Sequence, residues 1–200
     1  MNLVLQHSQI PTTWSDARVA LLPKPDGSTP PLSVASVLWR IGARVLVRKL
    51  SPWIRSWTDA SVMGGLPGTS ANSVHSILSH AIPKHSIFVS QDLARFFDSV
   101  SWEATREILT WLRCPGLVTQ LLASFYRQGR RLFSFAGGVS DNWFSPGRSL
   151  LPGCPMSPML AACFMQVWSH YDVKTSGVSL VMFVDDRTFW ASVGRATEPL

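Results

Sequence analysis

The sequence has 200 residues, of which 46% are hydrophobic and 15% are charged. This balance excludes a disordered chain and predicts one packed core or two small lobes. Lysine and arginine number 18 against 12 aspartate and glutamate, a formal net charge of +6, which favours a polyanion such as nucleic acid as a partner. Seven of the 18 cations lie between Arg18 and Arg55, where Asp26 is the one acid. That stretch fits a phosphate-facing surface and a solvated helix face equally well.

Cysteine usage and hydropathy indicate the compartment. Cys114, Cys154 and Cys163 form neither a CxxC pair nor a zinc-type spacing with histidine, so they predict no disulfide framework and fit a reducing environment. No apolar run reaches the roughly 20 residues that a membrane-spanning helix needs, and the first ten residues lack the features of a signal peptide. We therefore expect an intracellular chain, nuclear or cytoplasmic, without a membrane partner.

The first part of the chain predicts a strand followed by a helix. Residues 19–22 form an apolar strand that leads into a proline-rich Asp-Gly turn with Lys24 at its edge. Ser33 is a candidate cap for a helix that has one apolar face and one basic face. The apolar face comprises Val34, Val37, Leu38, Ile41, Val45 and Leu46, and the basic face comprises Arg40, Arg44 and Arg48.

A glycine-rich break at residues 64–68 separates this region from the next helix and strand. Residues 70–80 predict a short helix that ends before Pro83. Ile87, Phe88 and Val89 are β-branched or aromatic and predict a strand that leads directly into Asp92.

The second half of the chain predicts three helices and two hairpins. Asp98 or Ser99 is the candidate cap of a helix through Leu112, and a second helix follows over residues 115–128. Two short apolar runs around Gly137 predict a hairpin, and a glycine- and proline-rich loop over residues 147–158 follows it. Residues 159–170 predict a buried helix. Last, residues 178–184 and 187–190 predict a hairpin with Asp185 and Asp186 at its tip.

The adjacent carboxylates Asp185 and Asp186 follow an apolar strand. Each carboxylate loses hydration there unless a cation or a hydrogen-bond donor meets it, although an Asp-Asp pair can also simply form a turn. Asp92 also follows an apolar strand, so two neighbouring strands would bring three carboxylates to one end of a sheet. Such a group suits a pair of Mg²⁺ ions that assist displacement at phosphorus. Asp98 is better explained as a helix cap than as a ligand.

Three motifs in order resemble those of reverse transcriptases, especially the non-LTR retrotransposon and group II intron types. Residues 91–100, QDLARFFDSV, resemble the first catalytic motif, and residues 149–158, SLLPGCPMSP, resemble the second, usually written QGxPLSP. Residues 183–186, FVDD, resemble the F/Y-x-D-D box. Upstream, residues 20–27, ALLPKPDG, resemble the segment that begins the fingers of such domains. The resemblance covers nearly the whole chain.

The resemblance implies an RNA-directed DNA polymerase that joins deoxynucleotides to the 3′-hydroxyl of a DNA primer on an RNA template. Asp92 and Asp185 would hold two Mg²⁺ ions, for which Mn²⁺ could substitute, and Asp186 would be the neighbouring acid. The implied nucleotide-binding residues have ordinary structural alternatives: a turn lysine, core packing, a turn and a helix start. These residues are Lys24, which would contact the triphosphate, Phe97, which would block a ribose 2′-hydroxyl, Gly153 and Ser157.

The implied fold is of the α/β (α+β) class: a polymerase palm with an antiparallel sheet, helices on one face and a partial fingers region. We expect a fingers-like region over residues 1–85 and a first palm segment over 86–115. A helix and a hairpin at the junction would occupy 116–148, and a second palm segment 149–200. The chain stops soon after Trp190, before the thumb would begin, so we expect the thumb or other domains in a full-length element.

Two departures from the family pattern keep other functions open. Pro30 and Pro152 stand where the family has arginine and glutamine, and both of the lost side chains would touch nucleotide. Arg40 and Arg44 could supply positive charge but not the bidentate geometry. A catalytically inactive remnant that only binds nucleic acid is therefore the alternative, and an RNA-templated RNA polymerase is a third reading against which Phe97 argues.

Overall fold

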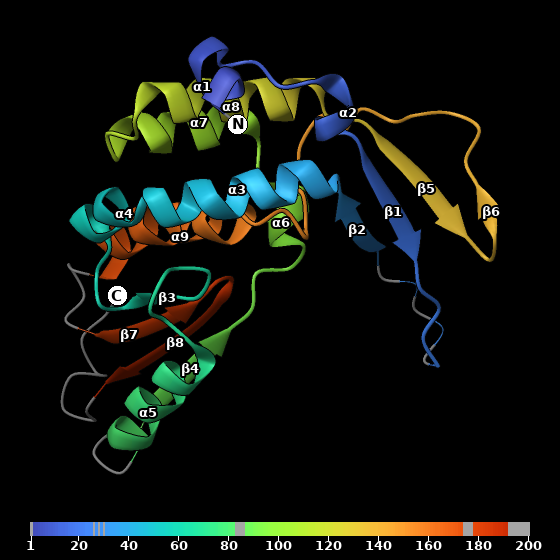
Figure 1. Ribbon diagram of the computed structural model, residues 1–200. Coiled ribbons are helices and arrows are strands. Elements are labelled where there is room, and N and C mark those ends of the chain that lie inside the picture. The colour runs from blue at the N-terminus through green and yellow to red at the C-terminus, as the bar shows by residue number, and fades with distance from the viewer. Residues whose placement is uncertain are drawn as a thin grey trace. The chain divides into compact units, whose positions relative to one another are not determined.

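The computed structural model describes residues 2–25, 27, 29, 31–82, 87–173 and 178–191. It is a mixed α/β fold, as predicted, and its chain divides into two compact units that are each discontinuous in sequence (Figure 1). Unit 1 comprises Met1–Lys49 and Phe97–Ser157, and unit 2 comprises Leu50–Phe96 and Pro158–Leu200. The four-segment division into fingers and palm stays a prediction. Asp26, Pro30 and Pro83 lie outside the described residues.

Unit 1 contains a four-stranded sheet in the order β2-β1-β5-β6. Strand β1 lies between β2, to which it is antiparallel, and β5, to which it is parallel, and β5 forms a hairpin with β6. Ser33 lies within β2 opposite Val19, so its prediction as a helix cap is wrong: pairing with β1 keeps this segment extended. The strands are β1 (Ala17–Leu21), β2 (Pro31–Ala35), β5 (Arg131–Phe135) and β6 (Gly138–Val139).

The helices of unit 1 include two that the sequence predicts correctly between residues 99 and 128. The cap of the first is Ser101, whose Oγ accepts a hydrogen bond from the Ala104 N–H at 3.1 Å. Asp98 and Ser99 are not caps, because they belong to the short helix α6, which comes before Ser101. The helices are α1 (Asn2–His7), α2 (Thr12–Ser15), α3 (Val37–Lys49), α7 (Trp102–Trp111) and α8 (Gly116–Gln128), with α6 (Phe96–Ser99) at the boundary between units.

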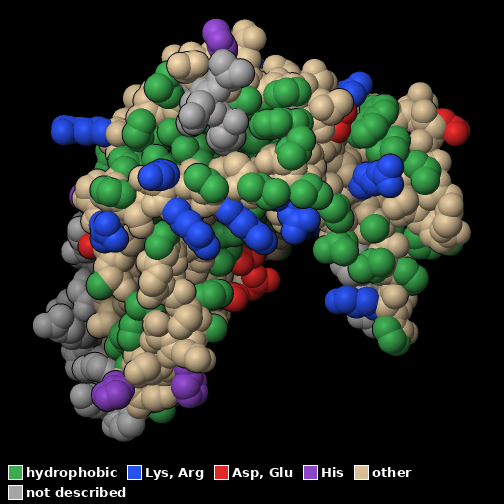
Figure 2. Space-filling view, in the orientation of Figure 1, with side chains coloured by type: hydrophobic (Ala, Val, Ile, Leu, Met, Phe, Trp, Pro, Cys, Tyr) green, Lys and Arg blue, Asp and Glu red, His purple; other side chains and the backbone are tan. Residues whose placement is uncertain are grey.

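Helix α3 buries Leu46 as predicted, but the other buried residues differ from the predicted apolar face. Its buried side chains include Trp39, Ala43 and Leu46, whereas the exposed fractions of Val37, Leu38, Ile41 and Val45 are 63%, 57%, 58% and 50%. The physical reason is Trp39, which is fully buried, stacks on Phe125 with ring centroids 4.1 Å apart, and donates its indole N–H to the Cys154 Sγ at 3.2 Å. Basic side chains follow the line of α3 (Figure 2), as the spacing of its arginines predicts.

Unit 2 contains a second four-stranded sheet, in the order β3-β7-β8-β4. It is antiparallel except at the two-residue strand β3, which is parallel to β7. The strand that leads into Asp92 and the hairpin over residues 178–190 are confirmed. The strands are β3 (Val62–Met63), β4 (Ile87–Gln91), β7 (Ser179–Phe183) and β8 (Asp186–Ala191).

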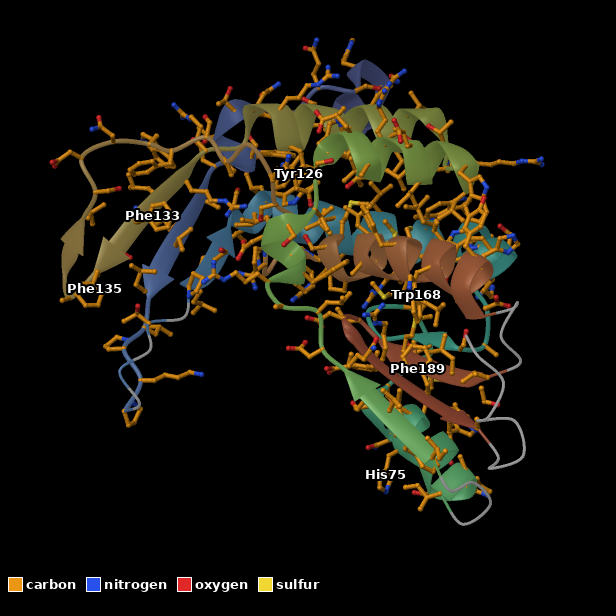
Figure 3. The ribbon with its side chains drawn as sticks, turned by 180° about the vertical axis from the view of Figure 1, so that it is seen from behind. His75, Tyr126, Phe133, Phe135, Trp168 and Phe189 are labelled. Atoms are coloured by element: carbon orange, nitrogen blue, oxygen red, sulfur yellow. The ribbon has the colours of Figure 1, made fainter. Side chains whose placement is uncertain are left out.

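Helices pack against this second sheet. The buried helix α9 (Ser157–Trp168), which runs on into a π-helical turn (Ser169–Val173), sets Trp168 edge-on to Phe189 of β8 at 5.4 Å between ring centroids (Figure 3). Helix α5 (Ala71–Ala81), capped by Ser70, contacts β7, and α4 (Ser51–Trp57) precedes β3. Among the described residues, no helix has both the length and the apolar character that crossing a membrane requires.

Candidate active site

Three aspartates lie at one end of the sheet in unit 2. Strands β4 and β8 are antiparallel, with Gln91 opposite Arg187, so the next position on each strand sets Asp92 beside Asp186. Asp186 is the first residue of β8 and pairs with Phe183 of β7. Asp185 lies in the two-residue turn between those strands. The sheet thus assembles the carboxylates from positions 92, 185 and 186, which are far apart in sequence.

The three carboxylates influence one another electrostatically. Asp185 is partly buried, whereas Asp92 and Asp186 are exposed. Burial raises the pKa of the Asp185 carboxyl, and the negative charges of Asp186 and Asp92 raise it further, while a backbone hydrogen bond opposes the shift. Each ionised carboxylate therefore makes the ionisation of its neighbour more costly in free energy. A bound cation would relieve that repulsion.

The donor set fits a hard divalent cation. Mg²⁺ usually takes one or two protein carboxylates and completes its coordination with water and substrate phosphates. Two exposed carboxylates and one partly buried carboxylate at a sheet end match that requirement. No group of three or more His, Cys, Asp or Glu side chains within the described ranges is already drawn together as a metal site. Asp92, Asp185 and Asp186 would therefore need water or substrate to complete any metal site.

The turn that holds Asp185 is strained and has a close neighbour. Val184 has φ 60°, a value that β-branched residues rarely adopt, and its N–H donates to the Met63 carbonyl at 3.1 Å. A Cβ added to Gly64, which has φ +84°, would lie 2.8 Å from the Val184 backbone nitrogen. Glycine at position 64 therefore lets β3 approach the turn. The sequence indicated only a break here, although a Gly-Gly pair is a signal for close backbone approach.

We predict that Gly64→Ala disturbs this turn. The left-handed φ costs alanine about 1–2 kcal/mol, and the contact with Val184 adds about 1–3 kcal/mol of overpacking. Gly68→Ala is the matched control, because Gly68 has φ +86° and open space around its Cβ position. Urea unfolding should show the larger loss for Gly64→Ala, and Mg²⁺ titration should show weaker binding in that variant alone. Equal losses in both variants would show that the approach of Gly64 to Val184 is unimportant.

Phe97 and the second motif lie together in unit 1. The Leu150 N–H donates to the Phe97 carbonyl at 2.7 Å, and the Ser149 N–H donates to the Val100 carbonyl at 2.9 Å. Phe97 itself is half-buried. Asp98 is exposed, lies within α6 and accepts a 3.4 Å hydrogen bond from the Ser149 hydroxyl.

Gly153 and Ser157 have structural partners within unit 1. A Cβ on Gly153, which has φ +83°, would lie 2.5 Å from the Ser33 carbonyl oxygen. The Ser157 hydroxyl donates to the Leu151 carbonyl at 2.7 Å and lies 3.4 Å from the Tyr126 hydroxyl. Lys24 is exposed in a turn in which the Gly27 N–H donates to its carbonyl at 3.0 Å. All four nucleotide-binding candidates belong to unit 1, and all three carboxylates to unit 2.

Known proteins resemble this chain in sequence and in fold. The retrovirus-related Pol polyprotein from type-1 retrotransposable element R2 of Nasonia vitripennis is 26% identical over 203 residues, which cover 92% of this chain and 20% of that protein. The chain thus spans about a fifth of its relative's length. The apo telomerase of Candida tropicalis, truncated from its C-terminal domain, has a TM-score of 0.68 at 13% identity, over 98% of this chain and 48% of that one. Telomerase of Candida albicans has a TM-score of 0.57 at 12% identity, over 95% and 41%.

The structural likenesses show the fold, and the sequence match shows the family. The telomerase structures share the arrangement of helices and sheets, which confirms the predicted polymerase fold class. Residues 22–195 match the family described as reverse transcriptase (RNA-dependent DNA polymerase), whose members are nucleotidyltransferases. The chain belongs to the reverse transcriptase family, and its sequence is similar to that of a retrotransposon protein.

Proposed function

We propose that this chain is the catalytic core of an RNA-directed DNA polymerase from a retroelement. It adds deoxynucleotides to the 3′-hydroxyl of a DNA primer on an RNA template. The observation that carries the proposal is the position of Asp92, Asp185 and Asp186 at one end of a sheet in a chain of this family.

In this proposal the carboxylates hold two Mg²⁺ ions, with Mn²⁺ as a substitute. Bound metal lowers the pKa of the attacking hydroxyl and neutralises charge on the leaving pyrophosphate. Asp92 supplies its carboxylate from the end of β4, while the hairpin of β7 and β8 fixes Asp185 and Asp186. The hairpin register fixes the backbone of Asp186 and the short turn fixes that of Asp185. Little conformational entropy is therefore lost when these carboxylates bind metal.

The residues of unit 1 select and orient the nucleotide. Phe97, held through its carbonyl by the Leu150 N–H, blocks a ribose 2′-hydroxyl. Lys24 contacts the triphosphate as an exposed cation, and Gly153 and Ser157 keep the second motif close to the nucleotide. RNA template, DNA primer and deoxynucleoside triphosphate are therefore the expected partners.

A second candidate function is nucleic-acid binding without catalysis. Pro152 stands where related enzymes have a glutamine, and neither the amide donors nor the carbonyl of that glutamine can be supplied by proline. Pro30, the other departure, lies outside the described residues. In this case the basic surface is retained while nucleotide is not positioned.

Primer extension decides between the two functions. The chain is incubated with a DNA primer on an RNA template, Mg²⁺, and either deoxynucleotides or ribonucleotides, and is compared with Asp185→Ala. We expect extension with deoxynucleotides only, and none in the variant. No extension by the wild type, with template binding that weakens steeply as salt rises, would favour the binding module. Unchanged extension by Asp185→Ala would contradict the carboxylate mechanism.

A further inference from the structure

Helix α3 of unit 1 presents an apolar row and a basic row side by side on its exposed surface. Val37, Ile41 and Val45 recur at every fourth position, which places them in line along the helix. Each is half exposed or more, and so is Leu38, which adjoins Ile41. Figure 2 shows hydrophobic and basic side chains next to one another along α3. The basic row has the same spacing and follows the apolar row three positions later: Arg40, Arg44 and Arg48. We call the two rows, with Leu38, the α3 face.

The core of unit 1 does not use the apolar row. A different side of α3 buries Trp39, Ala43 and Leu46, so the exposed aliphatic side chains are additional to the side that packs inward. Single exposed aliphatic side chains are common on protein surfaces, whereas adjoining ones with a polar rim mark interaction sites. Trp39 holds α3 in place by stacking on Phe125. The α3 face is therefore rigid before any partner arrives, which favours binding.

The basic row lacks acidic neighbours. Between Asp26 and Asp59 the sequence contains lysine and arginine but no acid. Within the part of the chain that the structure describes, no carboxylate lies within ion-pair distance of the basic row. Arg48 lies in the last turn of α3, where a positive charge stabilises the helix end by itself. Arg40 and Arg44 lie further from that end, so their charges are available to carboxylates of a partner.

The side chains of the α3 face favour a protein helix over a nucleic acid. Nucleic-acid sites combine cations with aromatic rings that stack on bases, whereas the exposed apolar residues of α3 are all valine, leucine and isoleucine. Aliphatic rows of this spacing form the ridges that interdigitate when two helices pack. A second copy of this chain is a poor occupant, because each copy has a net charge of +6 and brings the same basic row. The complementary partner is therefore acidic.

We propose that the α3 face docks an acidic amphipathic helix of a partner protein. The apolar side chains of that helix pack between Val37, Ile41 and Val45, and its carboxylates pair with Arg40 and Arg44. The apolar row spans roughly 12 Å at 1.5 Å per residue, so about three turns of partner helix cover it. Apolar contact supplies most of the affinity, and the basic row selects acidic partners. This docking does not rest on the proposed polymerase function.

The first test uses designed helical peptides of about 18 residues as probes. The glutamate peptide carries leucine at every third or fourth position and glutamate along one flank. The lysine peptide has lysine in place of glutamate, and the scrambled peptide has the residues of the first in another order. Fluorescence anisotropy of the labelled peptides measures their binding to the chain. The glutamate peptide is expected to bind about tenfold more tightly than the other two, or better. Absence of binding, or equal binding of the glutamate and lysine peptides, overturns the proposal.

The second test locates the peptide on α3. Ile41→Ser is expected to weaken binding of the glutamate peptide about tenfold, because it removes apolar area from the middle of the row. Arg44→Gln is expected to weaken it by up to about fivefold and to reduce its salt dependence. Both side chains are exposed, so the fold should be kept. Leu117→Ser and Arg127→Gln, on exposed positions of α8 in the same unit, are the matched controls and should bind as the wild type does. An Ile41→Ser variant that binds as Leu117→Ser does overturns the proposal.

RNA and lipid surfaces are the competing occupants of the α3 face. A short oligouridylate, and vesicles of phosphatidylcholine with phosphatidylserine, are each offered to the wild type and to Ile41→Ser. We expect the same affinity of the two chains for RNA, because an aliphatic side chain adds little to phosphate binding, and the same result for vesicles. If Ile41→Ser weakens RNA or vesicle binding as it weakens peptide binding, the face belongs to that ligand and the proposal is overturned.

The docking proposal and the polymerase proposal fail separately. Asp185→Ala should bind the glutamate peptide as the wild type does even though it loses extension, because Asp185 belongs to unit 2 and α3 to unit 1. A chain that never extends a primer but binds the glutamate peptide through Ile41 supports docking alone. A chain that extends a primer and does not bind the peptide contradicts docking alone.

Discussion

Asp185→Asn should abolish primer extension and yet leave the metal-free protein slightly more stable than the wild type. The loss in rate should be roughly a thousandfold or more, because metal-held charge stabilisation is worth several kcal/mol. The gain in stability follows from electrostatics. Burial and the charges of Asp186 and Asp92 raise the pKa of Asp185 above its ordinary value of 3.8, so the folded state opposes its ionisation.

The sign of the effect fixes its pH range. A raised folded pKa gives stability that is present below the ordinary pKa and is lost as pH rises through the raised value. Asparagine carries no charge and escapes that loss, so its advantage should appear at neutral pH and vanish in acid. Melting temperatures measured without metal, and again with Mg²⁺, give the test: Mg²⁺ should stabilise the wild type much more than the variant. If Asp185→Asn were less stable than the wild type at neutral pH without metal, the proposed repulsion among these carboxylates would be contradicted.

Trp39→Ala should destabilise the protein by about 3–5 kcal/mol. Trp39 is fully buried on α3, its ring stacks on Phe125 at an interplanar angle of 14°, and its N–H donates to Cys154. Alanine leaves a cavity that the helix cannot close, since the neighbouring side chains are already packed.

Trp39→Phe is the comparison that separates packing from hydrogen bonding. Phenylalanine keeps a stacking ring, but it is smaller than tryptophan and has no N–H donor. We therefore expect the loss of unfolding free energy to be well below that of Trp39→Ala. Urea unfolding followed by circular dichroism measures both variants. Equal losses for alanine and phenylalanine would mean that the hydrogen bond to Cys154, and not the ring, accounts for the effect.

The sequence predicts correctly the strand before Asp92 and the hairpin around Asp185. Strands that lead into acids leave a local pattern, since apolar β-branched runs stop where Asp92 and Asp185 begin. The pairing of Gln91 with Arg187, which sets Asp92 beside Asp186, is not local, and the sequence suggested it only through the assumption that two apolar strands ending in acids are neighbours. The structure supplies what spacing could not: the strain at Val184 and the close approach of Gly64.

Predictions from side-chain chemistry alone failed where tertiary packing decided. The periodicity of Val37, Leu38 and Ile41 identifies a helix correctly, but one bulky residue, Trp39, determines which face is buried. Ser33 has a capping side chain, yet strand pairing with Val19 holds it extended. Both errors come from partners distant in sequence, because helical period and cap chemistry report only local preferences.

The interleaving of the two units has a consequence for synthesis on the ribosome. Strand β1 completes its parallel edge only when β5 emerges, since Ala17 pairs with Arg131, and the whole of Leu50–Phe96 is translated in between for the other unit. That second unit in turn waits for β7 and β8. Neither unit can therefore fold from one continuous stretch of the nascent chain, and the open edge of β1 stays available for wrong pairing until β5 emerges. Shortened versions that end before β5 should consequently aggregate and depend on chaperones for recovery.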